Sequence, residues 1–184
     1  MIPILIVVLF IACIIWFVVT YNRFIHWQNL VKEAWSGIDV QLKRRYDLVP
    51  NIVETIKGYT GHEKDVFTDI SALRAGSFRS ENAQERSTAE NALTRSIKGL
   101  FAVVEAYPNL KANQQFLTLQ NTLIEIEDQI QYARRYYNGA VRNYNILVQT
   151  FPSNIIASFF KFAPREYFEI ELITERNVPE VQLP

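Results

Sequence analysis

Residues 134–145, RRYYNGAVRNYN, decide how the chain folds, because they belong to a long row of regularly spaced apolar positions. Three arginines, three tyrosines and three asparagines could form a nucleic-acid surface, a catalytic cluster or part of a packed helix. The row alternates spacings of three and four, which is typical of a helix that packs along a heptad seam, as in a coiled coil. Its members are Phe116, Leu119, Leu123, Ile126, Ile130, Ala133, Tyr137, Ala140, Tyr144 and Leu147. The spacing predicts one helix over about residues 112–149, with Tyr137 and Tyr144 in its core and Tyr136 exposed.

A polar strip runs beside this seam. Glu127 and Arg134 lie seven positions apart, so both side chains face the same neighbouring helix, two turns from each other. We predict that Glu127 pairs with Arg45 of the first helix. We predict that Arg134 pairs with Asp39, because buried charges need partners. The predicted structural polar network comprises Asp39, Arg45, Glu127, Arg134, Asn138 and Asn145.

Residues 2–19, IPILIVVLFIACIIWFVV, contain no charged side chain. As a helix they extend about 27 Å, close to the roughly 30 Å thickness of a bilayer core. The inner end of this run has three aromatic residues at or near it, Trp16, Tyr21 and Trp27. Such rings favour the interface between membrane and water. A cleaved signal peptide is the weaker interpretation, since no basic region precedes the run and no small-residue cleavage site follows it. A lipid-bearing Cys13 is also disfavoured, because the apolar run continues past it.

The remaining patterns are helical as well. One helix continues from the membrane span to Gly58, with a kink expected before Pro50. A short helix follows over about residues 62–75. The polar stretch at 75–88 is a loop or a weakly held helix start, and a helix from about Ala89 ends at Pro108. We therefore predict an all-α protein: a transmembrane helix at 1–20, an antiparallel bundle of about four helices at 21–150, and an aromatic-rich short helix with a tail at 151–184.

Three blocks in order resemble the LemA family of bacterial membrane proteins: RRYDLVPNIVETIKGYTGHE, EAYPNLKANQQFLTLQ and ARRYYNGAVRNYN. The later FPSNIIA and YFE stretches are similar to its C-terminal pattern. The resemblance implies one N-terminal span and an antiparallel helical bundle, and it implies no catalytic chemistry. It also implies a structural role, because a related protein of magnetosome-forming bacteria is tied to membrane remodelling. Some members are lipoproteins, and the uninterrupted span departs from that pattern.

Composition argues against several classes of function. Lys plus Arg and Asp plus Glu both number 19, so the basic excess of a nucleic-acid-binding protein is missing. HEKDV at His62 begins like a zinc-protease helix, but Val66 stands where the second His is needed. One Cys and two His leave little for metal binding. We expect no catalytic, metal or cofactor site, and therefore no enzyme.

The segment FPSNIIASFFKF, residues 151–162, holds many bulky apolar groups for its length. If the last long helix runs antiparallel to the first, this segment ends near the bilayer. It could pack on the base of the bundle, or it could contact the membrane interface while Lys161 reaches lipid phosphates. The second alternative is preferred, with Ile155, Ile156, Phe159, Phe160, Lys161 and Phe162 as the contact residues.

These observations predict a scaffold or adaptor anchored in the bacterial inner membrane. Its partners would be the lipid bilayer, further copies of the chain or other membrane proteins, and no nucleic acid. Arg23 and Lys32 follow the span, so the positive-inside rule predicts an outer N-terminus and a cytoplasmic domain; a periplasmic domain is the alternative. An accessory subunit of membrane-protein quality control or envelope stress response is a second interpretation, and a hydrolase a third.

Overall fold

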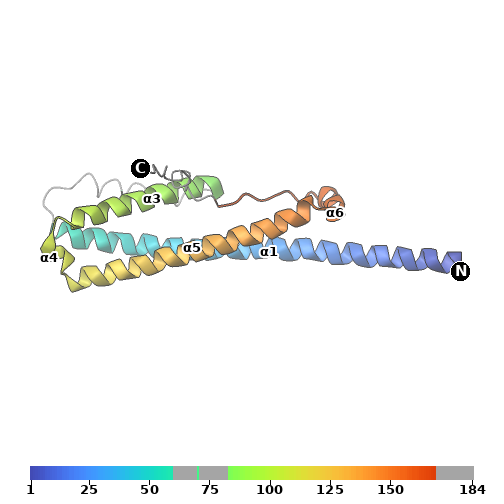
Figure 1. The fold of residues 1–184 in the computed structure, drawn as a ribbon, viewed down its shortest axis with the longest axis horizontal. Coiled ribbons are helices and arrows are strands. Elements are labelled where there is room, and N and C mark those ends of the chain that lie inside the picture. The colour runs from blue at the N-terminus through green and yellow to red at the C-terminus, as the bar shows by residue number, and fades with distance from the viewer. Residues whose placement is uncertain (60–69, 71–82, 169–184) are drawn as a thin grey trace, which may run out of the picture. The chain divides into compact units, whose positions relative to one another are not determined.

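The structure is a computed structural model that describes residues 1–59, 70 and 83–168. Within these residues the only regular elements are helices, which confirms the all-α class (Figure 1). The described helices are α1 (Ile2–Lys57), α3 (Ala83–Val104), α4 (Pro108–Lys111), α5 (Gln114–Gln149) and α6 (Ser153–Phe160). The helix expected over residues 62–75 lies outside the described residues, except for Ile70, which is helical and buried.

The first helix continues without a break from the uncharged run into the rest of the chain. It spans 56 residues and remains helical through Pro50. Its N-terminal part makes it a candidate membrane span by length and composition, and none of that apolar window is buried inside the protein. The membrane span and the first bundle helix are thus one continuous helix, as the absence of a helix-breaking residue predicts.

Two helix starts refine the expected boundaries. The third helix begins at Ala83 rather than near Ala89, because Ala83 and Ser87 extend its buried stripe backwards toward the N-terminus. Of the polar stretch at 75–88, the described residues 83–88 are helical, in agreement with the alternative of a helix start. At α5, the side-chain oxygen of Asn113 accepts a hydrogen bond from the Phe116 N–H at 3.0 Å, which caps the helix start.

The described chain forms two compact units, and each long helix contributes to both. The first unit comprises residues 1–42 and 128–167. Here Phe24 meets Tyr144 edge-on at 6.4 Å, and Trp35 meets Tyr137 at 5.3 Å between ring centroids. Residue numbers rise along α1 as they fall along α5, so the two helices are antiparallel in this unit (Figure 1).

The described residues of the second unit are 43–59, 70, 83–127 and 168. The end of α1, all of α3 and α4 and the start of α5 build its described core. Phe101 of α3 contacts Phe116 of α5, with ring centroids 6.0 Å apart. The side-chain amide of Asn113 donates to the Tyr59 hydroxyl at 2.8 Å, which ties the start of α5 to the end of α1. The buried apolar residues of this core are Val49, Ile52, Val53, Ile56, Leu93, Ile97, Leu100, Val104, Leu110, Leu123 and Ile126.

Candidate membrane-interface site

The turn between α5 and α6 is held by one serine. The Ser153 hydroxyl bonds the carbonyl oxygens of Leu147 at 2.7 Å and Thr150 at 2.8 Å. Leu147 belongs to the last turn of α5, where carbonyl oxygens lack partners within the helix, and Thr150 directly follows α5. Pro152 occupies the N-cap of α6. The chain therefore turns sharply, and α6 is fixed directly beside the end of α5.

One face of α6 packs against α1 at the end of the uncharged run. The Phe160 ring lies 5.9 Å from that of Phe17 and 4.8 Å from that of Tyr21. Just beyond α6, Phe162 stacks on Phe24 with centroids 4.6 Å apart and ring planes 8° apart. Because Phe17 belongs to the uncharged run, these contacts place α6 at the level of the last turn of that run.

The opposite face of α6 is exposed. Phe159 is 78% exposed, and Ile155 and the preceding Phe151 are also largely exposed. Three bulky apolar groups so close together form an unusual surface for a protein in water. We call Phe151, Ile155 and Phe159 the aromatic face of α6.

Some of the residues predicted to contact the membrane are thus exposed, whereas others pack against the protein. Ile155, Phe159 and Lys161 are exposed, and Phe160 is partly so. Ile156 is only 2% exposed, so assigning it to membrane contact was wrong. Phe162 was also assigned to membrane contact, but it is half-buried and stacks on Phe24. The reason is helical geometry, because neighbouring positions of a short helix point to different sides.

A two-way hydrogen bond holds the segment that follows α6. The Asn145 amide nitrogen donates to the Arg165 carbonyl oxygen at 2.8 Å, and the Arg165 N–H donates to the Asn145 side-chain oxygen at 2.8 Å. The Tyr137 hydroxyl donates to the Glu166 carbonyl oxygen at 3.0 Å. Asn145 was predicted to extend a network with α1, but it bonds the backbone of an extended segment instead. A side-chain amide carries both a donor NH₂ group and an acceptor oxygen, so it can pair with the N–H and the carbonyl of one backbone residue.

A buried charge cluster lies in the second unit. The Arg45 guanidinium donates to Thr94 Oγ1 at 2.9 Å and to Glu127 Oε1 at 2.7 Å, which is the pairing that the helix spacing predicts. The same guanidinium bonds one oxygen of Glu90, and the Tyr46 hydroxyl donates to the other. Arg45, Tyr46 and Glu90 are fully buried, so water cannot solvate their polar groups. Each of these groups is therefore stabilised by its hydrogen bonds to the others.

Glu90 is the residue that the sequence analysis missed. Its carboxylate accepts hydrogen bonds from both the Arg45 guanidinium and the Tyr46 hydroxyl, although it lies close to the stretch interpreted as a loop or a weak helix start. Leu93 and Ile97 follow it at spacings of three and seven, so it lies on the buried stripe of α3. That spacing was the available signal, and the charge of Glu90 concealed it.

The other members of the predicted network lie in the first unit. Arg134 is buried, whereas Asp39 and Asn138 are half-buried. The pairing of Arg134 with Asp39 stays a prediction. In the part of the chain that the structure describes, no three His, Cys, Asp or Glu side chains gather where they could hold a metal ion.

Burial raises the pKa of two tyrosines of the first unit above the ordinary value of 10.0. For Tyr137 and Tyr144, desolvation is the largest cause, and the nearby positive charge of Arg165 opposes it. Both hydroxyls therefore stay protonated at neutral pH. They act as neutral hydrogen-bonding groups in the packed core.

Comparison with known proteins gives one family and several relatives. Residues 34–183 match the model of the LemA family. Magnetosome protein MamQ 2 of Paramagnetospirillum magneticum is 26% identical over 194 residues, covering 91% of this chain and 70% of that protein. Magnetosome protein MamQ of Magnetospirillum gryphiswaldense is 22% identical over 174 residues, covering 80% and 64%. Protein LemA of Metamycoplasma hominis is 26% identical over 140 residues, covering 74% and 63%.

Proposed function

Since the chain belongs to the LemA family, as its sequence blocks predict, we propose that this membrane-associated protein acts as an anchored helical scaffold. It works by contact with other proteins and with lipid rather than by catalysis. The candidate membrane helix and the relation to a magnetosome protein support an action at a membrane.

The aromatic face of α6 is the observation that carries this proposal. Phe160 contacts Phe17 and Tyr21, so α6 stands at the depth where the span leaves the hydrocarbon. Phe159 and its neighbours on the aromatic face point away from this packing. Aromatic rings at that depth favour the headgroup region of a bilayer. The protein then touches the membrane through α1 and again through α6.

Two attachments suit a scaffold, because they restrict how the first unit stands on the membrane. We place the domain in the cytoplasm, since Arg23 and Lys32 follow the span and positive charge remains inside. A reporter that is active only in the cytoplasm, fused after Pro184, tests this orientation. Activity of a periplasm-dependent reporter at that position would reverse it.

We also propose self-association, which predicts a particle larger than a monomer when the chain is purified alone in detergent.

Photocrosslinking of the full-length chain in bacterial membranes tests the second attachment. A photoreactive phenylalanine derivative replaces Phe159, and the crosslinked lipid is measured by mass spectrometry. We expect lipid adducts, because the side chain points from α6 into the interface. Tyr136 is the matched control, since it is an exposed aromatic residue of the same unit that lies on α5. Equal lipid adducts at both positions, or adducts at neither, would refute the α6 contact; protein adducts at Phe159 would assign the face to a protein partner.

A further inference from the structure

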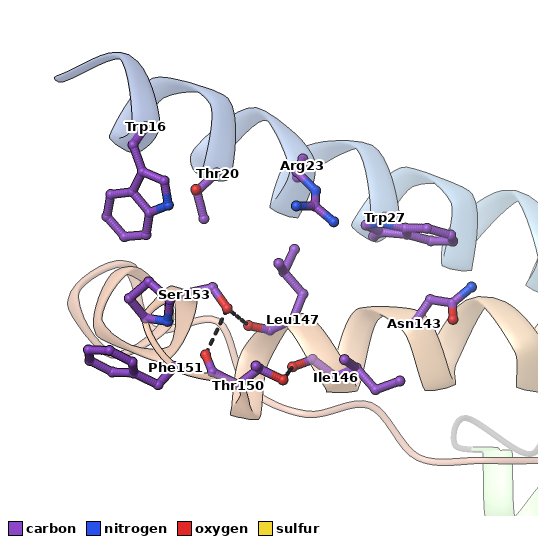
Figure 2. Close-up of a pocket in the computed structure, with 11 residues that line it drawn as sticks. Trp16, Thr20, Arg23, Trp27, Asn143, Ile146, Leu147, Thr150, Phe151 and Ser153 are labelled. Carbon is purple, nitrogen blue, oxygen red and sulfur yellow. Dashed lines mark hydrogen bonds between the residues drawn. The ribbon is translucent and has the colours of Figure 1, made fainter. Parts of the chain in front are cut away.

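A cavity of about 430 Å³ lies in the first unit, between α1 and the turn that joins α5 to α6. Figure 2 shows Trp16, Thr20 and Arg23 on α1 facing the end of α5 and the start of α6. Its volume falls within the range of small-molecule sites. Of the aromatic face of α6, Phe151 borders the cavity, whereas Ile155 and Phe159 do not line it.

The lining residues follow one another in depth along α1. Trp16 belongs to the uncharged run, Thr20 comes directly after it, and Arg23 follows about 6 Å above the end of the run. Trp27 closes the series one turn further on. With the run in the hydrocarbon, the cavity extends from the outermost acyl carbons through the level of the lipid phosphates.

The charge of the cavity has one sign. Arg23 is its only charged lining residue, and no carboxylate among residues 1–59, 70 and 83–168 forms an ion pair with it. Asn143 on the opposite wall carries an amide, and Thr20 carries a hydroxyl. A guanidinium with an amide and a hydroxyl matches the oxygens of a phosphate and of a hydroxyl-bearing headgroup. An ammonium headgroup finds no carboxylate here and meets the positive charge of Arg23.

We propose that this cavity binds the headgroup of an anionic phospholipid, with the phosphate on Arg23 and the first acyl carbons against Trp16. The inference rests on the membrane placement of α1 in the proposed function, but it does not need the contact made by the aromatic face of α6. Bound lipid joins α1 to the α5–α6 turn. The chain thereby selects the lipid that surrounds its span.

Quenching of tryptophan fluorescence in reconstituted bilayers tests the proposal. The full-length chain carries Trp35→Phe, so that the signal comes from Trp16 and Trp27. It is placed in phosphatidylcholine bilayers that contain either brominated phosphatidylglycerol or brominated phosphatidylcholine at equal mole fraction. We expect the brominated phosphatidylglycerol to quench more, because this lipid concentrates at the cavity. Equal quenching by both lipids overturns the proposal.

Matched variants locate the site. Arg23→Gln should reduce the preference for phosphatidylglycerol about tenfold, the usual scale for a lost charge-assisted hydrogen bond. Ile146→Phe fills the cavity from α5 and should abolish the preference while leaving Arg23 in place. Arg142→Gln removes an exposed positive charge from the same unit outside the cavity and should leave the preference unchanged. A loss of preference with Arg142→Gln equal to that with Arg23→Gln would show general charge attraction and refute a site.

Two further measurements separate this inference from its alternatives. Inorganic phosphate should not reverse the quenching difference; full reversal would identify a free-phosphate site and overturn the lipid assignment. Phe159→Ser removes part of the aromatic face without touching the cavity, so the preference should survive it. A preference that survives while photocrosslinking at Phe159 fails would retain the lipid site and reject the α6 contact. The opposite pattern would reject the lipid site alone.

Discussion

The same two long helices are joined by different chemistry in the two units. In the first unit, rings meet: Phe24 with Tyr144, and Trp35 with Tyr137. In the second unit, the Arg45 guanidinium bridges three elements through Glu90 of α3 and Glu127 of α5. Ring packing tolerates sliding along a seam, whereas a buried ion pair is satisfied at one alignment only. We therefore expect the charge cluster to set the register of the helices and the rings to add stability along them.

The largest effect should follow from Arg45→Ala. Removing the guanidinium leaves the fully buried Glu90 carboxylate without its counter-ion, and breaking a buried pair in this way costs about 3–5 kcal/mol. The free energy of unfolding from urea titrations measures the loss. Lys43→Ala, a change at an exposed position of α1 in the same unit, should alter it by less than about 0.5 kcal/mol.

Replacing both charges sharpens the same comparison. Arg45→Met with Glu90→Met should be at least about 1 kcal/mol more stable than Arg45→Met alone, because the fully buried carboxylate is then gone and only the partly exposed Glu127 lacks its partner. This gain would come with looser alignment, visible as broader amide resonances in the second unit. If Arg45→Ala unfolds at the same urea concentration as the unmodified chain, the cluster is not a buried determinant and the contrast between the units fails.

A smaller effect is expected from Asn145→Ala in the first unit. The change removes two hydrogen bonds to the Arg165 backbone, which predicts a loss of about 1–3 kcal/mol. The loss should be local, so limited proteolysis should cut the chain near Arg165 faster while the helices persist. Asn143→Ala, two positions earlier on α5, serves as the control. Equal cleavage rates in both variants would show that the hydrogen bonds of Asn145 do not hold the chain around Arg165.

The smallest effect concerns alkaline pH. Burial raises the pKa of Tyr144 in the folded state, so its stabilising contribution is complete below the unfolded value of 10.0 and is lost as pH rises through the higher folded value. The melting temperature should therefore fall between about pH 9 and about pH 11 by more in the unmodified chain than in Tyr144→Phe. Lysine deprotonation affects both proteins equally. Identical pH profiles would mean that the ionised tyrosine is accommodated without cost.

Sequence periodicity was sufficient to predict the long helices and to predict Glu127 as a partner of Arg45, because burial along a helix repeats every three or four residues. It was insufficient for Asn145, whose partner is a backbone segment without any periodic pattern. Glu90 was missed because a charged residue suggests an exposed position, although its spacing from Leu93 and Ile97 places it on the buried stripe of α3. The cavity beside Arg23 was not predictable either, since it depends on how the turn after α5 is folded back by Ser153.

The uninterrupted course of α1 has a mechanical consequence. A span usually adapts to a thinner or thicker bilayer by tilting. Here the helix enters the packed core of the first unit without a hinge, and α6 is fixed to it through Phe17 and Tyr21. Where α6 also rests on the surface, leaning of the span lifts α6 away or presses it inward. A change in bilayer thickness therefore strains the first unit. Lipids with longer or shorter acyl chains should shift the melting temperature of this unit.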